Sequence, residues 1–280
     1  MAMRTLIAAG LALAALLPVS AQTVTFEVAS VKERTAPTDG SFVGRRPGGR
    51  FAAENASLRE IVEYAYELQS FQLAGSLTPL ESARWDITAT LGATAAAQPG
   101  PDATIQAVRA LLADRFGLAA HRDTRTLPVY ALRLARADGA LGSGLKKSDT
   151  DCPALIAAAR AGSPPPPAAR QCGFRGRVGG LQMNGMPLSQ LGIGLSGRVG
   201  RAIVDQTGLA GTWDLTLTYA PDSTQIPAGT LSPNAPPPVA NPDAPSLFAA
   251  LQEQLGLRLV STTAPVEVLV VDRVSRPTLD

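Results

Sequence analysis

Apolar residues recur along this chain with helical and strand periods, and the same series of segments is written twice. Residues 107–118 read AVRALLADRFGL and residues 246–257 read SLFAALQEQLGL, and each is an apolar helical stripe closed by Gly-Leu. Gly117 and Gly256 stand where a helix end needs a left-handed residue, and the next leucine can fold back on the last turn. The pattern therefore predicts one helix of this kind in each half.

Other segments match in the same way. Residues 85–91 (WDITATL) and 213–219 (WDLTLTY) place apolar residues at every second position, which predicts half-buried strands. Ser57-Leu-Arg-Glu60 is a capping-box pattern and predicts a helix start. The matching helix over 187–199 carries three glycines, each costing about 1 kcal/mol relative to alanine. A short, frayed or bent helix is expected there.

The matched order predicts an α+β fold made of two tandem repeats, each a small sheet packed on two helices. The repeats are expected over 23–137 and 173–276, with a Pro-rich linker over 138–172 and a Pro-rich loop over 220–245. Each half is expected to read β-α-β-β-α-β-β. The last two strands of each half are expected to be separate: AAHRDTR and LPVYALRLA in the first, RLVST and APVEVLVVDRV in the second.

The N-terminal segment, residues 1–21, predicts a signal peptide. Arg4 precedes an apolar run from Leu6 to Leu17, and Val-Ser-Ala stands before Gln22. The alternative is a retained anchor, but the apolar run is short for a bilayer and no other segment is long and apolar enough. We expect an exported mature chain, periplasmic or extracellular, that starts near Gln22.

The net charge bears on nucleic acid as a partner, and the cysteine content bears on a disulfide or a metal site. The formal net charge of +2 gives no electrostatic reason to expect nucleic acid as a partner. In an exported protein the two cysteines, Cys152 and Cys172, favour a disulfide worth about 3 kcal/mol. A metal site is the alternative, but it would need more ligands, and His121 is the only histidine.

The sequence offers few candidates for chemistry. Residues 192–197 match G-x-G-x-x-G, with Asp214 beyond, but they follow the start of a helix and not a buried strand, so no nucleotide site is expected. His121 would need a serine and a carboxylate to act in a hydrolase, and no G-x-S-x-G motif supplies the serine. It is interpreted as a structural histidine at a strand edge in a charged hairpin.

The remaining polar and aromatic candidates also have structural interpretations. Glu60, Glu63 and Glu67 are interpreted as a solvated helix face, and Trp85 and Trp213 as core anchors. The sequence leaves open a pair of catalytic carboxylates of the glycosidase kind, because the two groups need only be close in space. We predict no catalytic, cofactor-binding or metal-binding residue.

Several motifs together resemble an exported protein family of soil bacteria, a domain of unknown function also found fused to antibiotic-sensing membrane metallopeptidases. The motifs include FEVASVK, LLADRFGL, LPVYAL, IVDQTGL, WDLTL and PVEVLVVD, and they cover most of residues 24–277. The resemblance implies export and the repeated α+β unit, and it implies no reaction. MPLSQL, AIVDQTGLAG and SLFAALQEQLGLRL are also similar, more weakly, to the short N-terminal domain of secretins and TonB-dependent receptors, a protein-contact module.

The function expected is that of a non-enzymatic exported binding or scaffold protein. It would use exposed sheet edges, or the face between its halves, to hold an unknown protein, peptide or envelope polymer. The alternative is a hydrolase of an extracellular polymer with an unrecognised active site. His121 hydrogen-bonded to a serine or carboxylate, or two carboxylates about 5–10 Å apart in a cleft, would favour the enzyme.

Overall fold

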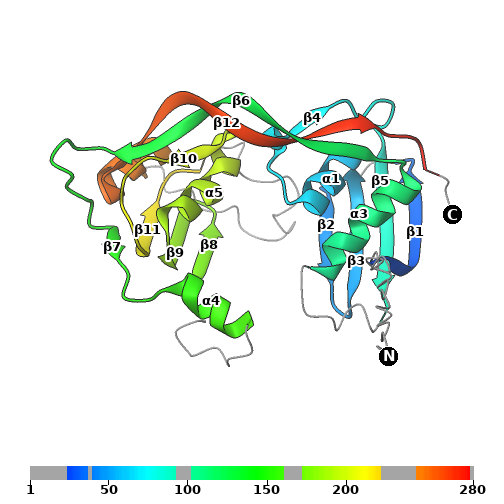
Figure 1. Ribbon diagram of the computed structural model, residues 1–280, viewed down its shortest axis with the longest axis horizontal. Coiled ribbons are helices and arrows are strands. Elements are labelled where there is room, and N and C mark those ends of the chain that lie inside the picture. Colours follow the sequence, from blue (N-terminus) through cyan, green and yellow to red (C-terminus); the bar gives the residue numbers. More distant parts are fainter. Residues whose placement is uncertain (1–23, 37–39, 93–101, 161–171, 222–243, 278–280) are drawn as a thin grey trace, which may run out of the picture.

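The computed structural model describes residues 24–36, 40–92, 102–160, 172–221 and 244–277 of the 280-residue chain. The predicted signal peptide and most of the Pro-rich segments lie outside these residues. Figure 1 shows two sheet-and-helix units, with a long two-stranded ribbon running over both. The predicted α+β fold class is confirmed.

The first four-stranded sheet has the order β1-β5-β3-β2, with all neighbours antiparallel. Trp85 is fully buried in its core and packs edge-on against Phe116, with the ring centroids 5.0 Å apart. The elements of this unit are β1 (Phe26–Arg34), β2 (Phe42–Arg46), β3 (Arg50–Ser57), α1 (Leu58–Tyr66), β5 (Arg84–Leu91) and α3 (Ala103–Arg115).

The second four-stranded sheet has the order β7-β11-β9-β8. If β1, β2, β3 and β5 are matched in chain order with β7, β8, β9 and β11, the two sheets have the same strand order. This matching supports the predicted duplication. The elements of this unit are β7 (Leu145–Lys147), β8 (Gly173–Arg177), β9 (Gly180–Met186), α5 (Leu188–Val199), β11 (Trp213–Thr218), α6 (Leu247–Ala250) and a π-helical turn, η4 (Leu251–Leu255).

The segment predicted as a linker, 138–172, contains regular structure. β7 pairs with β11 and buries Leu145 in the second core, and α4 (Cys152–Arg160) follows it. A three-residue strand with one apolar residue and two lysines shows too little alternation for the sequence pattern to reveal it.

The third sheet is the ribbon. β6 (Ala119–Leu134) and β12 (Leu257–Arg273) pair antiparallel over their whole length. Two short strands extend it in parallel: β10 (Ile203–Asp205) beside the end of β6, and β4 (Leu73–Gly75), preceded by the 3-10 turn η1 (Ser70–Gln72), beside the end of β12. The prediction of two separate strands in each of these segments is wrong, because each segment is one continuous strand.

Prolines near the middle of both strands do not interrupt the ribbon. Tyr130 donates its backbone N–H to a carbonyl next to β10, at 2.9 Å, so the nitrogen of Pro128, two residues earlier, also faces away from β12. In β12 the Glu267 carbonyl accepts from the Gln72 side chain, away from β6, so Pro265 faces the same way as Glu267. Neither proline therefore removes a hydrogen bond between β6 and β12.

The ribbon connects the two hydrophobic cores. Leu269 and Val271, near the end of β12, are buried in the core of the first unit. Leu132, near the end of β6, is buried in the core of the second unit. Each half thus completes its core with a strand end that comes from the other half.

The predicted helix ends are confirmed. Ser57 and Glu60 form the reciprocal hydrogen bonds of a capping box at the start of α1. Gly117 and Gly256 have φ angles of 55° and 70°, in the left-handed region. The backbone N–H of Leu118 folds back to the Leu112 carbonyl at 3.1 Å, which closes the last turn of α3.

The expectation of a short, frayed or bent helix over 187–199 is wrong, because α5 is continuous over twelve residues. A Cβ atom at Gly194 would collide with the ring of Phe174, and one at Gly197 would lie 2.7 Å from Oε1 of Gln69. Close packing of neighbours against these glycines stabilises the helix and outweighs their low helix propensity.

The repeated Trp-Asp pair has a structural role in both sheets. The Asp86 carboxylate accepts the backbone N–H of Asn55 at 2.8 Å, and the Asp214 carboxylate accepts that of Gly185 at 2.7 Å. Asn55 and Gly185 both have positive φ angles, 51° and 63°, and both lie at a break in strand register before a helix. The aspartate therefore holds the same bulge in each half.

Candidate binding groove

A groove of about 590 Å³ lies between α3 and the first half of β1. β1 is the outermost strand of its sheet, and α3 leaves the start of this strand uncovered. The floor and walls are largely apolar. The lining residues are Thr25, Phe26, Glu27 and Ala29 of the β1 region and Ala107, Ala110, Leu111, Ala113, Asp114 and Arg115 of α3.

Small side chains on one helix face create the hollow. Ala107, Ala110, Leu111 and Asp114 follow the i, i+3, i+4, i+7 spacing that places residues on one side of a helix. Two of the four are alanines, which do not reach β1.

The backbone of Ala29 in β1 faces the outer side of the sheet, beside the groove. Leu91 of β5 donates its N–H to Gly49, on the β3 side, at 3.2 Å. Backbone N–H and carbonyl groups point to alternate sides along a strand. Those of Thr90 therefore point toward β1, and those of its register partner Val28 point toward β5. Ala29 therefore directs its N–H and carbonyl outward, where no described strand pairs with it.

The rim of the groove carries more acidic than basic groups. Glu27 has no ion-pair partner among the residues that the structure describes. Asp114 pairs with Arg115, the neighbouring residue, at 3.5 Å. Glu27 is therefore the charge at this site that has no described counter-ion.

The matching place in the second half is closed. The register of β7 on β11 makes residues 139–144 the counterpart of the start of β1. Gly144 donates its N–H to the Gln254 carbonyl of η4 at 2.8 Å, and a Cβ atom at Gly142 would collide with the same oxygen. The chain lies directly on the helix there, so the open groove belongs to the first half alone among the described residues.

A smaller hollow of about 250 Å³ lies where the two halves meet under the ribbon. Phe71 of the first half and Arg201 of the second half both line it, together with Pro128 of β6. Arg201 lies over the ring of Tyr130, 5.3 Å from the ring centroid. This hollow is the face between the halves named as an alternative site.

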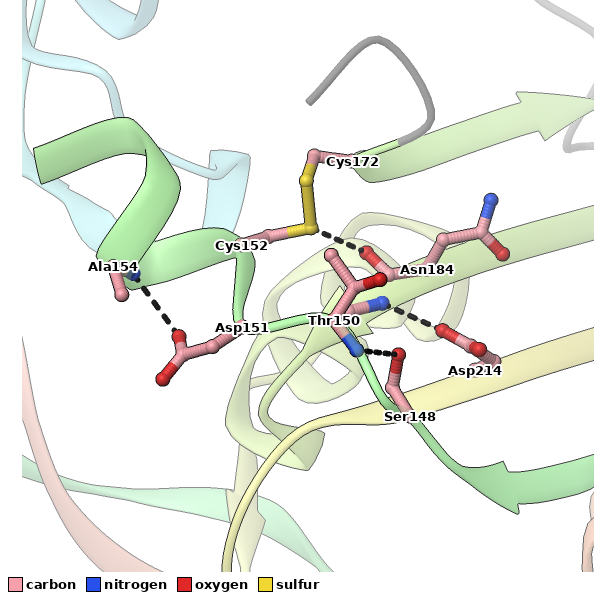
Figure 2. Close-up of a disulfide and its surroundings, with 9 residues drawn as sticks. Ser148, Thr150, Asp151, Cys152, Ala154, Cys172, Asn184 and Asp214 are labelled. Atoms are coloured by element: carbon pink, nitrogen blue, oxygen red, sulfur yellow. Dashed lines mark hydrogen bonds between the residues drawn. A yellow bond between two sulfur atoms is a disulfide. The ribbon is translucent and has the colours of Figure 1, made fainter. Parts of the chain in front are cut away.

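The predicted disulfide between Cys152 and Cys172 is present, with the Cα atoms 5.5 Å apart. It ties the first residue of α4 to the residue before β8, beside the carbonyl of Asn184 in β9 (Figure 2). A Cβ atom at Gly185 would collide with Sγ of Cys152. The disulfide therefore packs against the bulge of the second sheet, away from the groove.

His121 pairs with a carboxylate, an arrangement that would favour an enzyme. Its Nδ1 lies 2.9 Å from Oδ2 of Asp272 on the neighbouring strand of the ribbon. Both side chains are about half exposed, 56% and 47%. Within the described part of the chain no serine, threonine or cysteine hydrogen-bonds to His121. The residue lies in a continuous strand and not in the predicted hairpin.

The three glutamates of α1 do not form a uniformly solvated face. Glu60 belongs to the capping box. Burial raises the pKa of the Glu63 carboxyl, and the ion pair with Arg59 only partly offsets this effect. Glu67 is largely exposed and ends the helix in a left-handed conformation. The prediction of a solvated face therefore holds for Glu67 only.

The nucleotide motif has a structural explanation. Its three glycines lie inside α5 and not in a strand-to-helix turn, and the Asp214 carboxylate accepts the backbone N–H of Gly185 at the bulge.

The described residues contain no group of three or more His, Cys, Asp or Glu side chains placed to hold a metal ion. None of the described helices is long and apolar enough to span a bilayer.

The comparisons with known proteins give one family match. Residues 59–274 match the family described as "Protein of unknown function (DUF3738)". No curated protein matches the chain, and no solved structure does. The match spans the chain from α1 to just beyond the end of β12, so it includes the second unit and the ribbon, while β1, β2 and β3 of the first sheet precede it. The chain is a member of the DUF3738 family.

Proposed function

We propose that this protein is an exported, non-enzymatic binding protein that holds its ligand in the groove between β1 and α3. The observation that carries the proposal is an apolar groove of about 590 Å³ beside an open strand edge. Concave, mostly apolar sites with a few polar groups are the usual form of binding sites. The resemblance of the second half to a protein-contact module of secretins supports a binding role as well.

The lining of the groove supports binding more than catalysis. Its side chains are mainly alanine, leucine and phenylalanine, and its charged groups stand at the rim. General acid–base catalysis requires a titratable group within hydrogen-bond reach of the reacting atoms. The two carboxylates of the lining, Glu27 and Asp114, are exposed, and no histidine, serine or cysteine stands among the lining residues that the structure describes.

A blocking variant tests this proposal. Ala110→Trp would fill the groove from α3, while Ala157→Trp makes the same change on an exposed face of α4. Immobilised mature protein is incubated with envelope extract, and retained protein and polysaccharide are quantified. Ala110→Trp is expected to retain about tenfold less than the wild type, and Ala157→Trp as much as the wild type. Equal retention by all three proteins would overturn the proposal.

The alternative, a hydrolase of an extracellular polymer, has the His121–Asp272 pair in its favour. The pair orients an imidazole, but the described residues add no nucleophile beside it. The test is release of soluble fragments from isolated envelope polymer by the wild type and by Asp272→Asn. Neither protein is expected to release fragments. Release by the wild type that Asp272→Asn abolishes would establish the hydrolase instead.

A further inference from the structure

We infer that the ligand of the groove is an extended polypeptide segment, which pairs as a further strand with the start of β1, at Ala29. This inference rests on the proposed function and names its ligand class. An open strand edge can take another strand through main-chain hydrogen bonds, and side-chain pockets then add specificity.

The backbone of Ala29 provides the first contact. Its N–H and carbonyl point out of the sheet, next to the groove, and no described strand meets them. A polysaccharide could satisfy these groups individually, but an extended polypeptide matches both their spacing and their donor–acceptor order. The geometry of this edge therefore favours a polypeptide.

The side chains of the added strand would face two different surfaces. On the α3 side they would meet Phe26, Ala29 and Leu111 and the small Ala110, which leave room for an apolar side chain. On the opposite side they would meet Val28, which is 66% exposed. Because successive residues of a strand point to opposite faces, we expect apolar residues next to both surfaces.

Charge adds a further requirement. Glu27 stands at the rim of the groove with no described partner, and the only described basic group of the lining is Arg115, which pairs with Asp114. A lysine or arginine in the bound segment would supply the missing counter-ion to Glu27. The ligand is thus an extended segment with apolar residues and one basic residue near its Glu27 end.

In the second half the counterpart of the start of β1 lies directly against the helix. Residues 142 and 144, both glycine, lie against the end of η4, and the N–H of Gly144 reaches the Gln254 carbonyl. In the first half the corresponding helix stands away from β1, and the space between them is open. The first half therefore has room beside β1 for a segment of another molecule, room that the corresponding place in the described part of the second half lacks.

The experiment uses a display library of random twelve-residue peptides, selected on the mature protein and depleted on Ala110→Trp. Enriched sequences are expected to combine apolar residues with a lysine or arginine. One enriched peptide is then synthesised with its basic residue kept, and again with glutamate in its place. The Glu27→Lys variant should weaken binding of the basic peptide about fivefold or more and strengthen binding of the acidic one.

Strand addition has its own readout, which groove filling by a helix would not give. Binding should slow hydrogen exchange of the Ala29 amide, observed by NMR, by at least about tenfold. Ala29→Pro removes this donor and should weaken peptide binding about tenfold, while Ala29→Ser keeps the amide and should bind like the wild type.

The outcomes separate the two proposals. If no peptide is enriched, or if the Ala29 amide exchanges equally fast with and without peptide, strand addition is overturned. Retention of envelope polysaccharide by the wild type, lost in Ala110→Trp, would in that case leave the proposed function standing with a different ligand. Loss of both activities would overturn both proposals. Thermal unfolding of each variant, compared with the wild type, identifies any variant that is misfolded. If Ala110→Trp or Ala29→Pro is misfolded, the exposed substitution Glu27→Lys provides the test of peptide binding.

Discussion

Leu127 of β6 lies directly opposite Ala264 of β12, at the centre of the ribbon. Pro128 and Pro265 lie one step away on their respective strands, and each faces a threonine. Half a turn about this central pair exchanges the two long strands and brings β4 close to the place of β10, with the two short strands offset by two residues in register. The ribbon thus has the symmetry expected of two related halves.

The first prediction is that the halves superpose. In a crystal structure, residues 23–137 laid on the second half, extended from the predicted 173–276 to include β7, should bring Trp85 onto Trp213 and Gly117 onto Gly256. The shared strand order and the shared bulge are the reasons. Tryptophans that fall on unrelated elements would refute the duplication.

The second prediction concerns the bulge of the second sheet. Gly185→Asn should destabilise the protein by roughly 2–3 kcal/mol, because the new Cβ atom would meet Sγ of Cys152 and the Thr150 carbonyl. Asparagine tolerates a positive φ, as Asn55 shows at the matching position, so the loss would come mainly from the collision.

The matched control is Asn55→Gly, which keeps the left-handed conformation and removes a side chain that bonds to the Gly40 carbonyl at 2.6 Å. It should cost only about 1 kcal/mol. Urea unfolding at neutral pH measures both variants. A larger loss for Asn55→Gly than for Gly185→Asn would mean that the collision at Gly185 is not the dominant cost.

The third prediction is a pair of opposite pH effects on one helix. Burial alone would raise the pKa of the Glu60 carboxyl, but hydrogen bonds from Ser41 and Ser57 and the ion pair with Arg84 outweigh it, so the pKa is lowered. The stability that ionised Glu60 contributes is present above its unfolded pKa and is lost as the pH falls through its folded pKa. Glu60→Gln should therefore destabilise at pH 7 and have less effect at about pH 3.

Glu63 should behave in the opposite way. Burial raises the pKa of its carboxyl, and the pairing with Arg59, at 3.8 Å, only partly offsets this. The folded protein is therefore penalised while Glu63 is ionised, and the penalty vanishes as the pH falls below the unfolded pKa. Glu63→Gln should stabilise at pH 7 and lose that advantage near pH 3. Urea titrations at the two pH values measure both variants, and effects of the same sign at pH 7 would show that the two carboxyls do not lie in opposite environments.

The fourth prediction is that the Cys152–Cys172 bridge is structural. Unreduced, denatured mature protein should give no titratable thiol, and the double Cys→Ser variant should lose about 3 kcal/mol, near the chain-entropy value for a loop of this length. Both cores should stay folded, since neither depends on β8 alone. Two thiols per chain would exclude the bridge.

Local structure was predictable where the cause is local. The capping box at Ser57, the left-handed stops at Gly117 and Gly256, and the alternation after Trp85 all depend on a few neighbouring residues. The continuity of the glycine-rich helix α5 was not predictable, because its stability comes from packing by residues distant in the sequence, such as Phe174. Helix propensity is a weak guide once tertiary contacts are formed.

The groove between β1 and α3 was not predictable from the sequence for a different reason. Its residues, such as Ala110 and Phe26, look like ordinary core positions, and the site consists of the space that they leave open. Strand pairing was hidden as well: alternation identifies the buried face of β6 and β12, but it does not identify the partner of each strand.

The exchange of strand ends also sets an order of folding. The second core needs Leu132, which is made early, and can close once the start of β12 is available. The first core needs Leu269 and Val271, and β4 needs the end of β12 as its partner. Contacts between such distant parts of a chain form slowly. As the chain emerges from its N-terminus, the half that is made first is the last to be finished.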